Sequence, residues 1–365
     1  MVDMEPTKTI QIKRRHSSHE DAVGTLTIDD PRLDGYRPDP AIVQQYVSRK
    51  MPNGMTDIEY CMAVWRGDET LGCPARENLM FVGDTQGGKT MLVNVLACKI
   101  GEEMGLGVPV PVFTLSASNG ITDFDLFGQD KPWTNPETGT DHIVWLPGLA
   151  DMAARVGGIL YIDEANMMPE RVTSSLHPLC DYRRMFVNRN KAVKVPGDGF
   201  VADVVQANPD LWIVGTMNPN YRGAGPLNEA FSERFRWLLW DYDQAVETKL
   251  IPNDAVRTLG QALRQLRELG KIRTPTGTAT LMRMVRDVHR DGVDMALYVL
   301  RSKFTADERP YVDEVIESRS FKVLIANAAE HRHPLSGSGE HVMELVVGAD
   351  LLQLRVGIYQ RLPVP

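Results

Sequence analysis

The segment GDTQGGKT at residues 83–90 constrains this chain of 365 residues more than any other feature. It fits the pattern G-x-x-x-x-G-K-[ST], which is typical of a phosphate-binding loop. An apolar run at residues 78–82 precedes the loop and is typical of a buried strand, and residues 91–103 follow it with the apolar spacing of a helix. The sequence therefore predicts a strand, a phosphate-binding loop and a helix in succession.

A glycine-rich turn at a helix N-terminus suits a polyphosphate because its backbone N–H groups concentrate partial positive charge. In such a loop Lys89 reaches the β- and γ-phosphates, and the hydroxyl of Thr90 helps to hold Mg²⁺. We expect the nucleotide to contact nine consecutive residues: Gly83, Asp84, Thr85, Gln86, Gly87, Gly88, Lys89, Thr90 and Met91. A chance glycine-rich turn is the alternative, and the flanking strand and helix disfavour it.

Composition and charge exclude several other classes of protein. Hydrophobic residues make up 43% of the chain, enough for a sizeable core, and no apolar run reaches the length of about 18 residues that a membrane span needs. The polar N-terminus lacks the apolar region of a signal peptide, and the four cysteines lack CxxC spacing, so we expect a cytoplasmic protein with reduced thiols. The net charge of −8 argues against a broad nucleic-acid surface.

The fold class follows from apolar runs that alternate with helical patterns. Besides residues 78–82, such runs occupy residues 109–115, 157–162, 211–215 and 236–240. This alternation predicts a five-stranded parallel sheet. Together with the loop motif, it resembles the αβα sandwich of P-loop NTPases. We also expect two inserted hairpins, one within residues 128–148 and one that pairs residues 184–187 with 192–195 around a turn at 188–191.

The chain divides into three predicted parts. Residues 1–35 are polar and predict a flexible or loosely docked lead-in. Residues 36–243 form the predicted α/β domain, which begins with two short helices at 40–47 and 57–66. Residues 244–365 predict a small all-α lid domain and a C-terminal extension, with helices at 245–250, 255–269, 279–289, 312–330 and 341–354.

Asp163 and Glu164 directly follow the predicted strand at residues 157–162. Two carboxylates at the end of a buried strand, downstream of a phosphate-binding loop, form a Walker B pattern. Asp163 would hold the water shell of Mg²⁺, and Glu164 would polarise the attacking water. A pair of surface acids at a strand end is the alternative interpretation.

Asn218 follows the predicted strand at residues 211–215. If that strand neighbours the one that ends in Asp163, the Asn218 side chain lies beside the carboxylates and can hydrogen-bond both the γ-phosphate and the attacking water. A simple Asn-Pro turn at residues 218–219 is the alternative.

With these landmarks in order, the chain resembles the AAA+ ATPases. Within them it is most similar to the MoxR group, some of whose members remodel Rubisco or serve metal chelatases. The resemblance rests on GDTQGGKT at 83–90, the strand with DEAN at 159–166, GTMNPN at 215–220, LNEAFSERF at 227–235 and the two hairpins. It covers about residues 36–300.

The resemblance implies roles for two residues outside the loop. Asn218 is similar to the sensor 1 of the family. Arg234 matches the arginine finger, which reaches the nucleotide of a neighbouring subunit, so that each site is completed only in a ring, usually a hexamer. A planar, always-charged guanidinium suits this role. A helix-end salt bridge is the alternative for Arg234, and Arg236 and Arg222 are rival fingers.

The lid departs from the family pattern. The family commonly places an arginine early in the helix that corresponds to residues 276–285, where this chain has Ala279 or Thr280. Arg283, one turn later, is a substitute, or this sensor is missing.

The resemblance implies a ring-forming ATPase that uses ATP and Mg²⁺ to remodel or activate a separate partner protein, in relatives often one with a von Willebrand A domain. A nucleotide-gated assembly module with little turnover and a nucleic-acid-associated motor stay open as alternatives. A nucleotide kinase is less favoured because no second basic phosphate site is evident. The sequence does not fix a preference for adenine over guanine.

Overall fold

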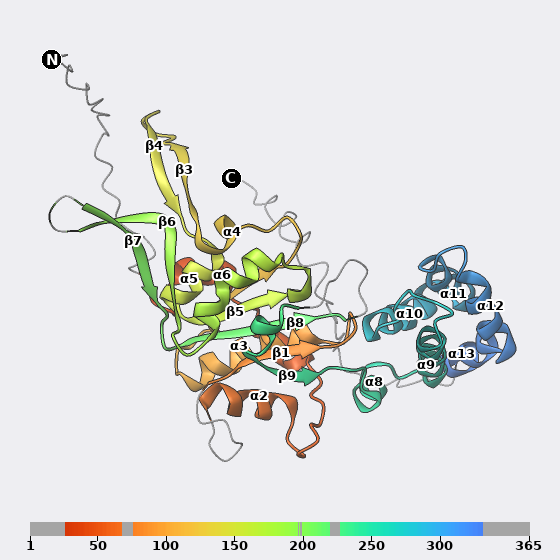
Figure 1. The fold of residues 1–365 in the computed structure, drawn as a ribbon. Coiled ribbons are helices and arrows are strands. Elements are labelled where there is room, and N and C mark those ends of the chain that lie inside the picture. The colour runs from red at the N-terminus through yellow and green to blue at the C-terminus, as the bar shows by residue number, and fades with distance from the viewer. Residues whose placement is uncertain (1–25, 68–75, 196, 198, 220–226, 331–365) are drawn as a thin grey trace, which may run out of the picture.

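A computed structural model describes residues 26–67, 76–195, 197, 199–219 and 227–330. An α/β domain surrounds a central sheet, and a helical domain follows it through α8 (Gln244–Leu250). Figure 1 shows the helical domain to one side of the sheet, with two β-hairpins that project from the other side.

The central sheet has five parallel strands in the order β2-β5-β8-β1-β9. They are β1 (Asn78–Val82), β2 (Val112–Ser116), β5 (Gly158–Asp163), β8 (Leu211–Met217) and β9 (Phe235–Leu239). The predicted five-stranded parallel sheet is therefore confirmed. Because parallel strands run the same way, their carboxyl ends all meet at one edge of the sheet.

Helices cover both faces of the sheet, since successive side chains of a buried strand point to opposite faces. Leu79 and Phe81 of β1 belong to one core cluster, under α2 (Asp57–Arg66) and α3 (Lys89–Glu103). Met80 belongs to the other cluster, which includes residues of α5 (Leu149–Val156) and α6 (Glu170–Cys180). The predicted αβα sandwich is confirmed.

The segment before the α/β domain is docked where the structure describes it. Residues 26–36 include the short 3-10 helix η2 (Pro31–Tyr36), and α1 (Ile42–Gln45) follows. Leu33 is 1% exposed and packs in the core, and Arg37 donates to the carbonyl oxygens of Pro109 (2.7 Å) and Ile28 (3.0 Å). Of the two predicted states, flexible or loosely docked, residues 26–35 therefore have the docked one, which depends on the buried Leu33; residues 1–25 lie outside the described part.

The first hairpin agrees with the prediction and the second does not. β3 (Gln129–Thr134) pairs with β4 (Asp141–Leu146) after α4 (Asp123–Phe127). In the second, the turn predicted at residues 188–191 lies inside β6 (Met185–Val195), which pairs with β7 (Gly199–Gln206). The polar residues 188–191 form a register shift instead, because the side chains of Asn188 and Asn190 donate to the carbonyl oxygens of Phe127 (2.8 Å) and Gly128 (3.1 Å).

The helical domain has its own hydrophobic core. It contains α9 (Asp254–Glu268), α10 (Thr278–Asp291), α11 (Val293–Ser302), α12 (Arg309–Ser318) and α13 (Phe321–Glu330). Residues 312–330 form parts of two helices rather than the single predicted one, because the chain turns at Ser320 with a φ of 51°. The prediction missed α11, and the helix predicted at 341–354 lies outside the described residues. No helix in the described ranges is long and apolar enough to cross a membrane.

Glu308 stabilises the turns of this domain. The residue is 2% exposed, and its carboxylate accepts from the backbone N–H groups of Thr274 (3.0 Å) and Thr305 (3.1 Å) and from the Thr274 hydroxyl (2.6 Å). Burial raises the pKa of Glu308, but the hydrogen bonds outweigh it and lower the pKa to about 2. The ionised carboxylate is thus the form that holds the turns together.

We expect Glu308→Gln to lower the free energy of unfolding by about 2 kcal/mol at neutral pH, since it weakens hydrogen bonds to a charged group. A depressed pKa stabilises the folded state above the pKa of the unfolded chain, so the difference from the parent should shrink as the pH falls from 4.5 towards 2. Denaturant unfolding at several pH values measures it, with the exposed Glu314→Gln as control. If Glu308→Gln lowers the free energy of unfolding by the same amount at every pH, the ionised Glu308 carboxylate is not what stabilises the turns.

Candidate nucleotide site

The candidate site lies at the carboxyl edge of the sheet. β8 pairs with β1 on one side, with Val82 opposite Met217, and with β5 on the other, with Ile162 opposite Gly215. The loops that follow β1, β5 and β8 therefore start side by side. This arrangement brings together the phosphate-binding loop, the Asp163–Glu164 pair and Asn218.

The phosphate-binding loop wraps the N-terminus of α3. Gly88 is the N-cap of α3 with a φ of 86°, and a Cβ on Gly83 would lie 2.0 Å from the carbonyl oxygen of Trp240. Both positions therefore require glycine. The Nζ of Lys89 donates to the carbonyl oxygens of Gly83 (2.7 Å) and Asp84 (2.6 Å), which holds the ammonium inside the loop. Burial lowers the pKa of Lys89, and the Asp163 carboxylate opposes this shift.

Three side chains from outside the motif support the loop. The indole N–H of Trp240 donates to the carbonyl oxygen of Gly87 (2.9 Å), and Arg49 donates to the same oxygen (3.1 Å) while its guanidinium stacks 3.7 Å above the Trp240 ring. The hydroxyl of Tyr242 donates to the carbonyl oxygen of Thr85 (2.9 Å). Sequence reasoning missed all three, since no motif marks them and they are distant from the loop along the chain.

The two predicted metal ligands are joined through a buried tyrosine. The hydroxyl of Tyr161 donates to Asp163 Oδ1 (2.8 Å) and forms a hydrogen bond with Thr90 Oγ1 (2.9 Å). Thr216 Oγ1 also donates to Asp163 Oδ1 (2.6 Å). Sequence reasoning missed Tyr161 and Thr216, although they precede the predicted site residues Asp163 and Asn218 by two positions each.

The donor set fits Mg²⁺. One carboxylate and one hydroxyl are hard oxygen ligands, and Mg²⁺ usually takes few protein ligands and fills its shell with phosphates and water. Within the described ranges, no group of three or more histidine, cysteine, aspartate or glutamate residues could hold a metal ion. Asp163 and Thr90 are thus the residues that would hold Mg²⁺ here, together with the phosphates of a nucleotide.

Glu164 sits in an unusual backbone conformation. Its φ of 55° is in the left-handed region, which is costly for a residue other than glycine, and its N–H donates to Thr216 Oγ1 (3.2 Å). Burial and the neighbouring Asp163 charge raise the pKa of Glu164, and Lys89 opposes them. The adjacent loop is fixed by Asn166, whose side chain donates to the carbonyl oxygen of Asn218 (3.0 Å). Asn218 itself is 4% exposed.

Arg234 lies at the opposite edge of the sheet. Its carbonyl oxygen accepts from the side chain of Asn78 (3.0 Å), the first residue of β1. The phosphate-binding loop begins at the far end of β1, roughly 13 Å away at about 3.3 Å per residue. The structure therefore does not bring Arg234 to the loop of its own chain.

The Arg234 guanidinium has partners in its own subunit. It forms an ion pair with Asp181 (3.7 Å) and donates to the carbonyl oxygen of Ala230. The alternative of a local salt bridge is thus present in the structure, and a role towards a neighbouring subunit stays a prediction. Of the rival arginines, Arg236 pairs with Glu77, and residue 222 lies outside the described part.

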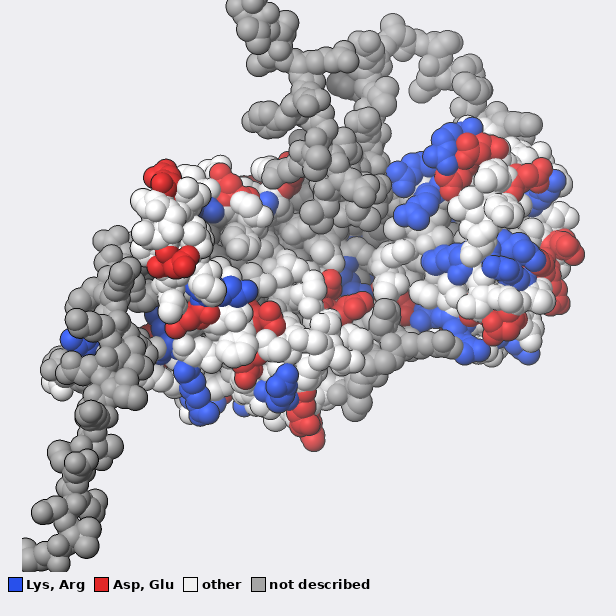
Figure 2. All heavy atoms as spheres, turned by 90° about the horizontal axis from the view of Figure 1, so that it is seen from above, with Lys and Arg blue, Asp and Glu red and all other residues white. Residues whose placement is uncertain are grey.

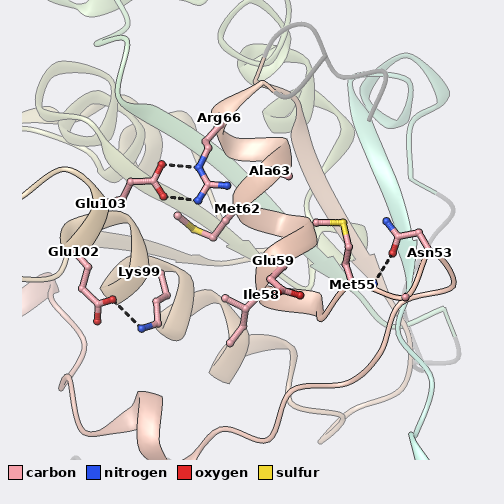
Figure 3. A pocket seen from close by; sticks show the side chains of 11 residues that line it. Asn53, Met55, Ile58, Glu59, Met62, Ala63, Arg66, Lys99, Glu102 and Glu103 are labelled. Atoms are coloured by element: carbon pink, nitrogen blue, oxygen red, sulfur yellow. Dashed lines mark hydrogen bonds and ion pairs between the residues drawn. The ribbon is translucent and has the colours of Figure 1, made fainter. Parts of the chain in front are cut away.

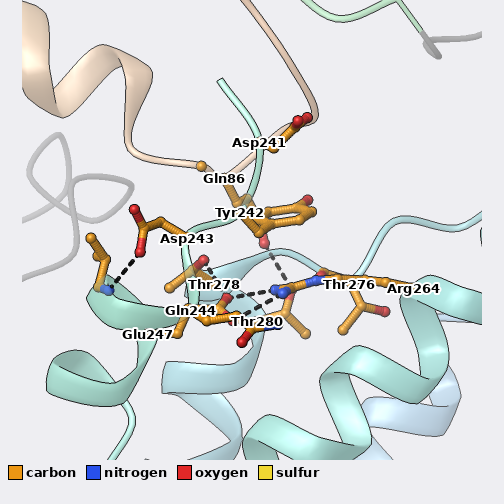
Figure 4. Close-up of polar contacts among 12 residues, drawn as sticks. Gln86, Asp241, Tyr242, Asp243, Gln244, Glu247, Arg264, Thr276, Thr278 and Thr280 are labelled. Carbon is orange, nitrogen blue, oxygen red and sulfur yellow. Dashed lines mark hydrogen bonds and ion pairs between the residues drawn. The ribbon is translucent and has the colours of Figure 1, made fainter. Parts of the chain in front are cut away.

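The helical domain contacts the phosphate-binding loop directly. Thr280 Oγ1 donates to Gln86 Oε1 (2.8 Å), and Arg267 of α9 forms an ion pair with Asp84. Arg283, the predicted substitute for the lid arginine, is exposed. Figure 4 shows Gln86 and Thr280 on either side of their hydrogen bond; nearby, the guanidinium of Arg264 stacks on the ring of Tyr242, 3.7 Å from its centroid.

Two surface hollows lie away from these residues. One, of about 900 Å³, is lined by α2 and the end of α3 and is flanked by the ion pairs Arg66–Glu103 and Lys99–Glu102 (Figure 3). Another, of about 950 Å³, lies at the amino edge of the sheet and includes Arg234. Neither contains a residue of the phosphate-binding loop, so the site is identified by its motif residues and their geometry.

Comparisons with known proteins agree with this geometry. Residues 78–235 match the family model of the AAA domain, dynein-related subfamily. Protein CbbQ of Hydrogenophilus thermoluteolus is 30% identical over 182 residues, which cover 48% of this chain and 58% of CbbQ. An uncharacterized protein of Staphylococcus haemolyticus is 31% identical over 166 residues, 46% of this chain and 56% of that protein. The matches span little more than half the length of these two relatives.

Among solved structures, a candidate ATPase of Cytophaga hutchinsonii superposes with a TM-score of 0.37 at 15% identity. This superposition covers 77% of this chain and 78% of that structure.

We expect Tyr161→Phe to weaken Mg²⁺-dependent nucleotide binding about tenfold, because the variant removes the hydroxyl that orients both metal ligands. Calorimetric titration of nucleotide with Mg²⁺ and with EDTA measures the effect. Tyr60→Phe is a matched control, since the Tyr60 hydroxyl accepts from Arg236 (3.1 Å), away from the site. Equal losses with and without Mg²⁺ would mean that Tyr161 only stabilises the fold.

Proposed function

We propose that this chain, whose residues 78–235 match the family model of the AAA domain, dynein-related subfamily, is an Mg²⁺-dependent ATPase that works as a ring and remodels or activates a partner protein. The observation that carries the proposal is the placement of charged groups on the sheet. Lys89, Asp163, Glu164 and Asn218 lie at or beside its carboxyl edge, and Arg234 lies at its amino edge.

Each residue at the carboxyl edge has a defined part in hydrolysis. Lys89 binds the terminal phosphates, and Thr90 and Asp163 hold Mg²⁺, which neutralises phosphate charge when it is bound. Glu164 orients and polarises the attacking water, since it is a carboxylate beside Asp163 and opposite Lys89. Asn218, which follows β8 at the same edge, has the proposed role of hydrogen-bonding the attacking water and the γ-phosphate. Most of the rate enhancement then comes from electrostatic stabilisation.

Ring formation is proposed from the position of Arg234. A guanidinium that is separated from its own loop by the length of β1 can reach a nucleotide only on a neighbouring subunit. A ring, by family resemblance a hexamer, supplies such a neighbour for every site. The ion pair with Asp181 must then open or rearrange when subunits meet.

A separate protein partner is proposed from the hairpins and from the family resemblance. Seven large apolar side chains on them are at least 46% exposed: Trp133, Ile143, Leu146, Val187, Phe200, Val201 and Val204. Both hairpins project away from the helical domain (Figure 1), which leaves them accessible to another protein. A partner with a von Willebrand A domain and a cytoplasmic location stay predictions from the sequence.

Two alternative functions stay open. The Arg234–Asp181 ion pair favours a nucleotide-gated assembly module with little turnover, because it engages the predicted arginine finger within its own subunit. A nucleic-acid motor is disfavoured: Figure 2 shows basic and acidic side chains interspersed on the visible face, and the net charge is −8.

ATP turnover as a function of protein concentration tests the proposal, with oligomer mass read by light scattering. We expect specific activity to rise as rings form. Glu164→Gln should lower turnover at least about 100-fold, and Arg234→Ala about 1,000-fold, while ATP still binds.

Arg66→Ala is the control, since Arg66 pairs with Glu103 at the surface and is no candidate finger, and Arg236→Ala tests the rival, which pairs with Glu77. Parental turnover by assembled Arg234→Ala rings would assign the finger to another residue. An assembled parent that binds ATP without hydrolysing it would favour the assembly module.

The pH dependence of turnover tests the role of Glu164. Only the ionised carboxylate polarises water, and its pKa is raised by burial and by Asp163. We therefore expect turnover to fall on the acid side with a midpoint above 4.5, the ordinary glutamate value. Steady-state rates between pH 4 and 8, with ring mass checked at each pH, measure it. A midpoint at or below 4.5 would contradict the assignment.

A further inference from the structure

Asp84 of the phosphate-binding loop forms an ion pair with an arginine of the helical domain. Arg267 Nη1 of α9 donates to Asp84 Oδ2, and the two side chains are only 16% and 20% exposed. Arg267 Nε also donates to the carbonyl oxygen of Arg273 (3.1 Å), which holds the guanidinium from the helical side. The ion pair therefore joins the two domains at the loop.

A second contact keeps the domains close at the same point. Thr280 Oγ1 donates to Gln86 Oε1 (2.8 Å) and accepts from the ammonium of Lys303 (2.9 Å). A Cβ on Gly277 would lie 2.6 Å from the Gln86 Cβ, so the backbone before α10 approaches the loop as closely as glycine allows. Figure 4 shows Gln86 and Thr280 on the two sides of this contact.

Asp84 and a bound polyphosphate would compete for the same cation. The Asp84 carbonyl oxygen accepts from Lys89 Nζ (2.6 Å), and its carboxylate accepts from Arg267. Lys89 is the cation that the terminal phosphates engage. Asp84 contacts Lys89 through its backbone and Arg267 through its side chain, so both cations lie at the same residue of the loop. The guanidinium of an arginine binds a phosphate or a carboxylate best through two parallel N–H donors. Two anions that lie side by side at the same guanidinium repel each other.

We propose that Asp84 is an internal competitor of the γ-phosphate for Arg267. Without a triphosphate, the carboxylate holds Arg267 and couples the helical domain to the loop. With ATP, the γ-phosphate takes the guanidinium, whereas ADP lacks the group that would displace Asp84. The Asp84–Arg267 pair thus sets how strongly the site prefers ATP to ADP. This inference rests on the nucleotide site of the proposed function and needs neither the ring nor a partner.

Two single substitutions test it, because they should act in opposite directions. The measured quantity is the ratio of dissociation constants for ADP and for a non-hydrolysable ATP analogue, each with Mg²⁺. Arg267→Gln removes the cation and should lower the preference for the analogue about tenfold, and Asp84→Asn removes the competitor and should raise it about tenfold. If the ion pair only holds the two domains together, both variants lose the same contact. The ratio of dissociation constants would then shift in the same direction in both variants.

Controls separate this effect from damage to the fold. Arg257→Gln lies on the same helix and pairs with Asp254 within the helical domain, so its ratio should match the parent. Arg267→Lys keeps the positive charge but lacks the planar guanidinium, so its ratio of dissociation constants should lie between those of the parent and of Arg267→Gln. It also keeps the test valid if Arg267→Gln does not fold.

The outcomes distinguish this inference from the proposed function. Opposite shifts in Asp84→Asn and Arg267→Gln support it. Shifts in the same direction, or ratios equal to that of the parent, overturn it while nucleotide binding by the parent leaves the proposed function standing. A parent that binds neither nucleotide overturns both.

Discussion

The parallel register of β1, β5 and β8 is the constraint on which the rest of the site depends. β8 lies between the other two strands, so the phosphate-binding loop, the carboxylates and Asn218 all begin at one edge. Apolar side chains on both faces of the sheet fix that register, because a slip by one residue would turn buried side chains towards the wrong face. The hydrophobic core of the sheet thus positions the candidate catalytic residues at its carboxyl edge, and the same sheet places Arg234 at its amino edge.

Buried hydroxyl groups convert this placement into a defined geometry. Tyr161 and Thr216 bring two neutral donors to Asp163, and Tyr161 extends the network to Thr90. Such a network holds its charged member without adding a competing charge, which leaves the carboxylate available to a cation. The helical domain adds a second layer of control, since Arg267 and Thr280 contact the loop from outside the sheet. The loop at residues 83–90 therefore belongs to the candidate nucleotide site and also contacts the helical domain.

Sequence reasoning succeeded where the signal was local. The strand, loop and helix at residues 78–103 and the five apolar strands are confirmed, and the match of residues 78–235 to the AAA domain agrees with the resemblance to AAA+ proteins. It failed where a distant contact decided the structure: Asn188 and Asn190 read as a turn, but they bond to the residues around the end of α4. Leu33 sat in a polar segment and is nevertheless buried. The roles of Glu164, Asn218 and Arg234 stay predictions, because geometry alone does not report turnover.

The sequence by itself determined the phosphate-binding loop, the strand that ends in Asp163 and the alternation of strands and helices, since each depends on residues adjacent along the chain. Only the tertiary structure decided which side chains surround them. Trp240 and Arg49 brace Gly87 from segments roughly 150 and 40 residues away, and Arg267 reaches Asp84 across 183 positions. Such contacts leave no periodic pattern, because strand order and domain packing bring them together rather than local conformational preference.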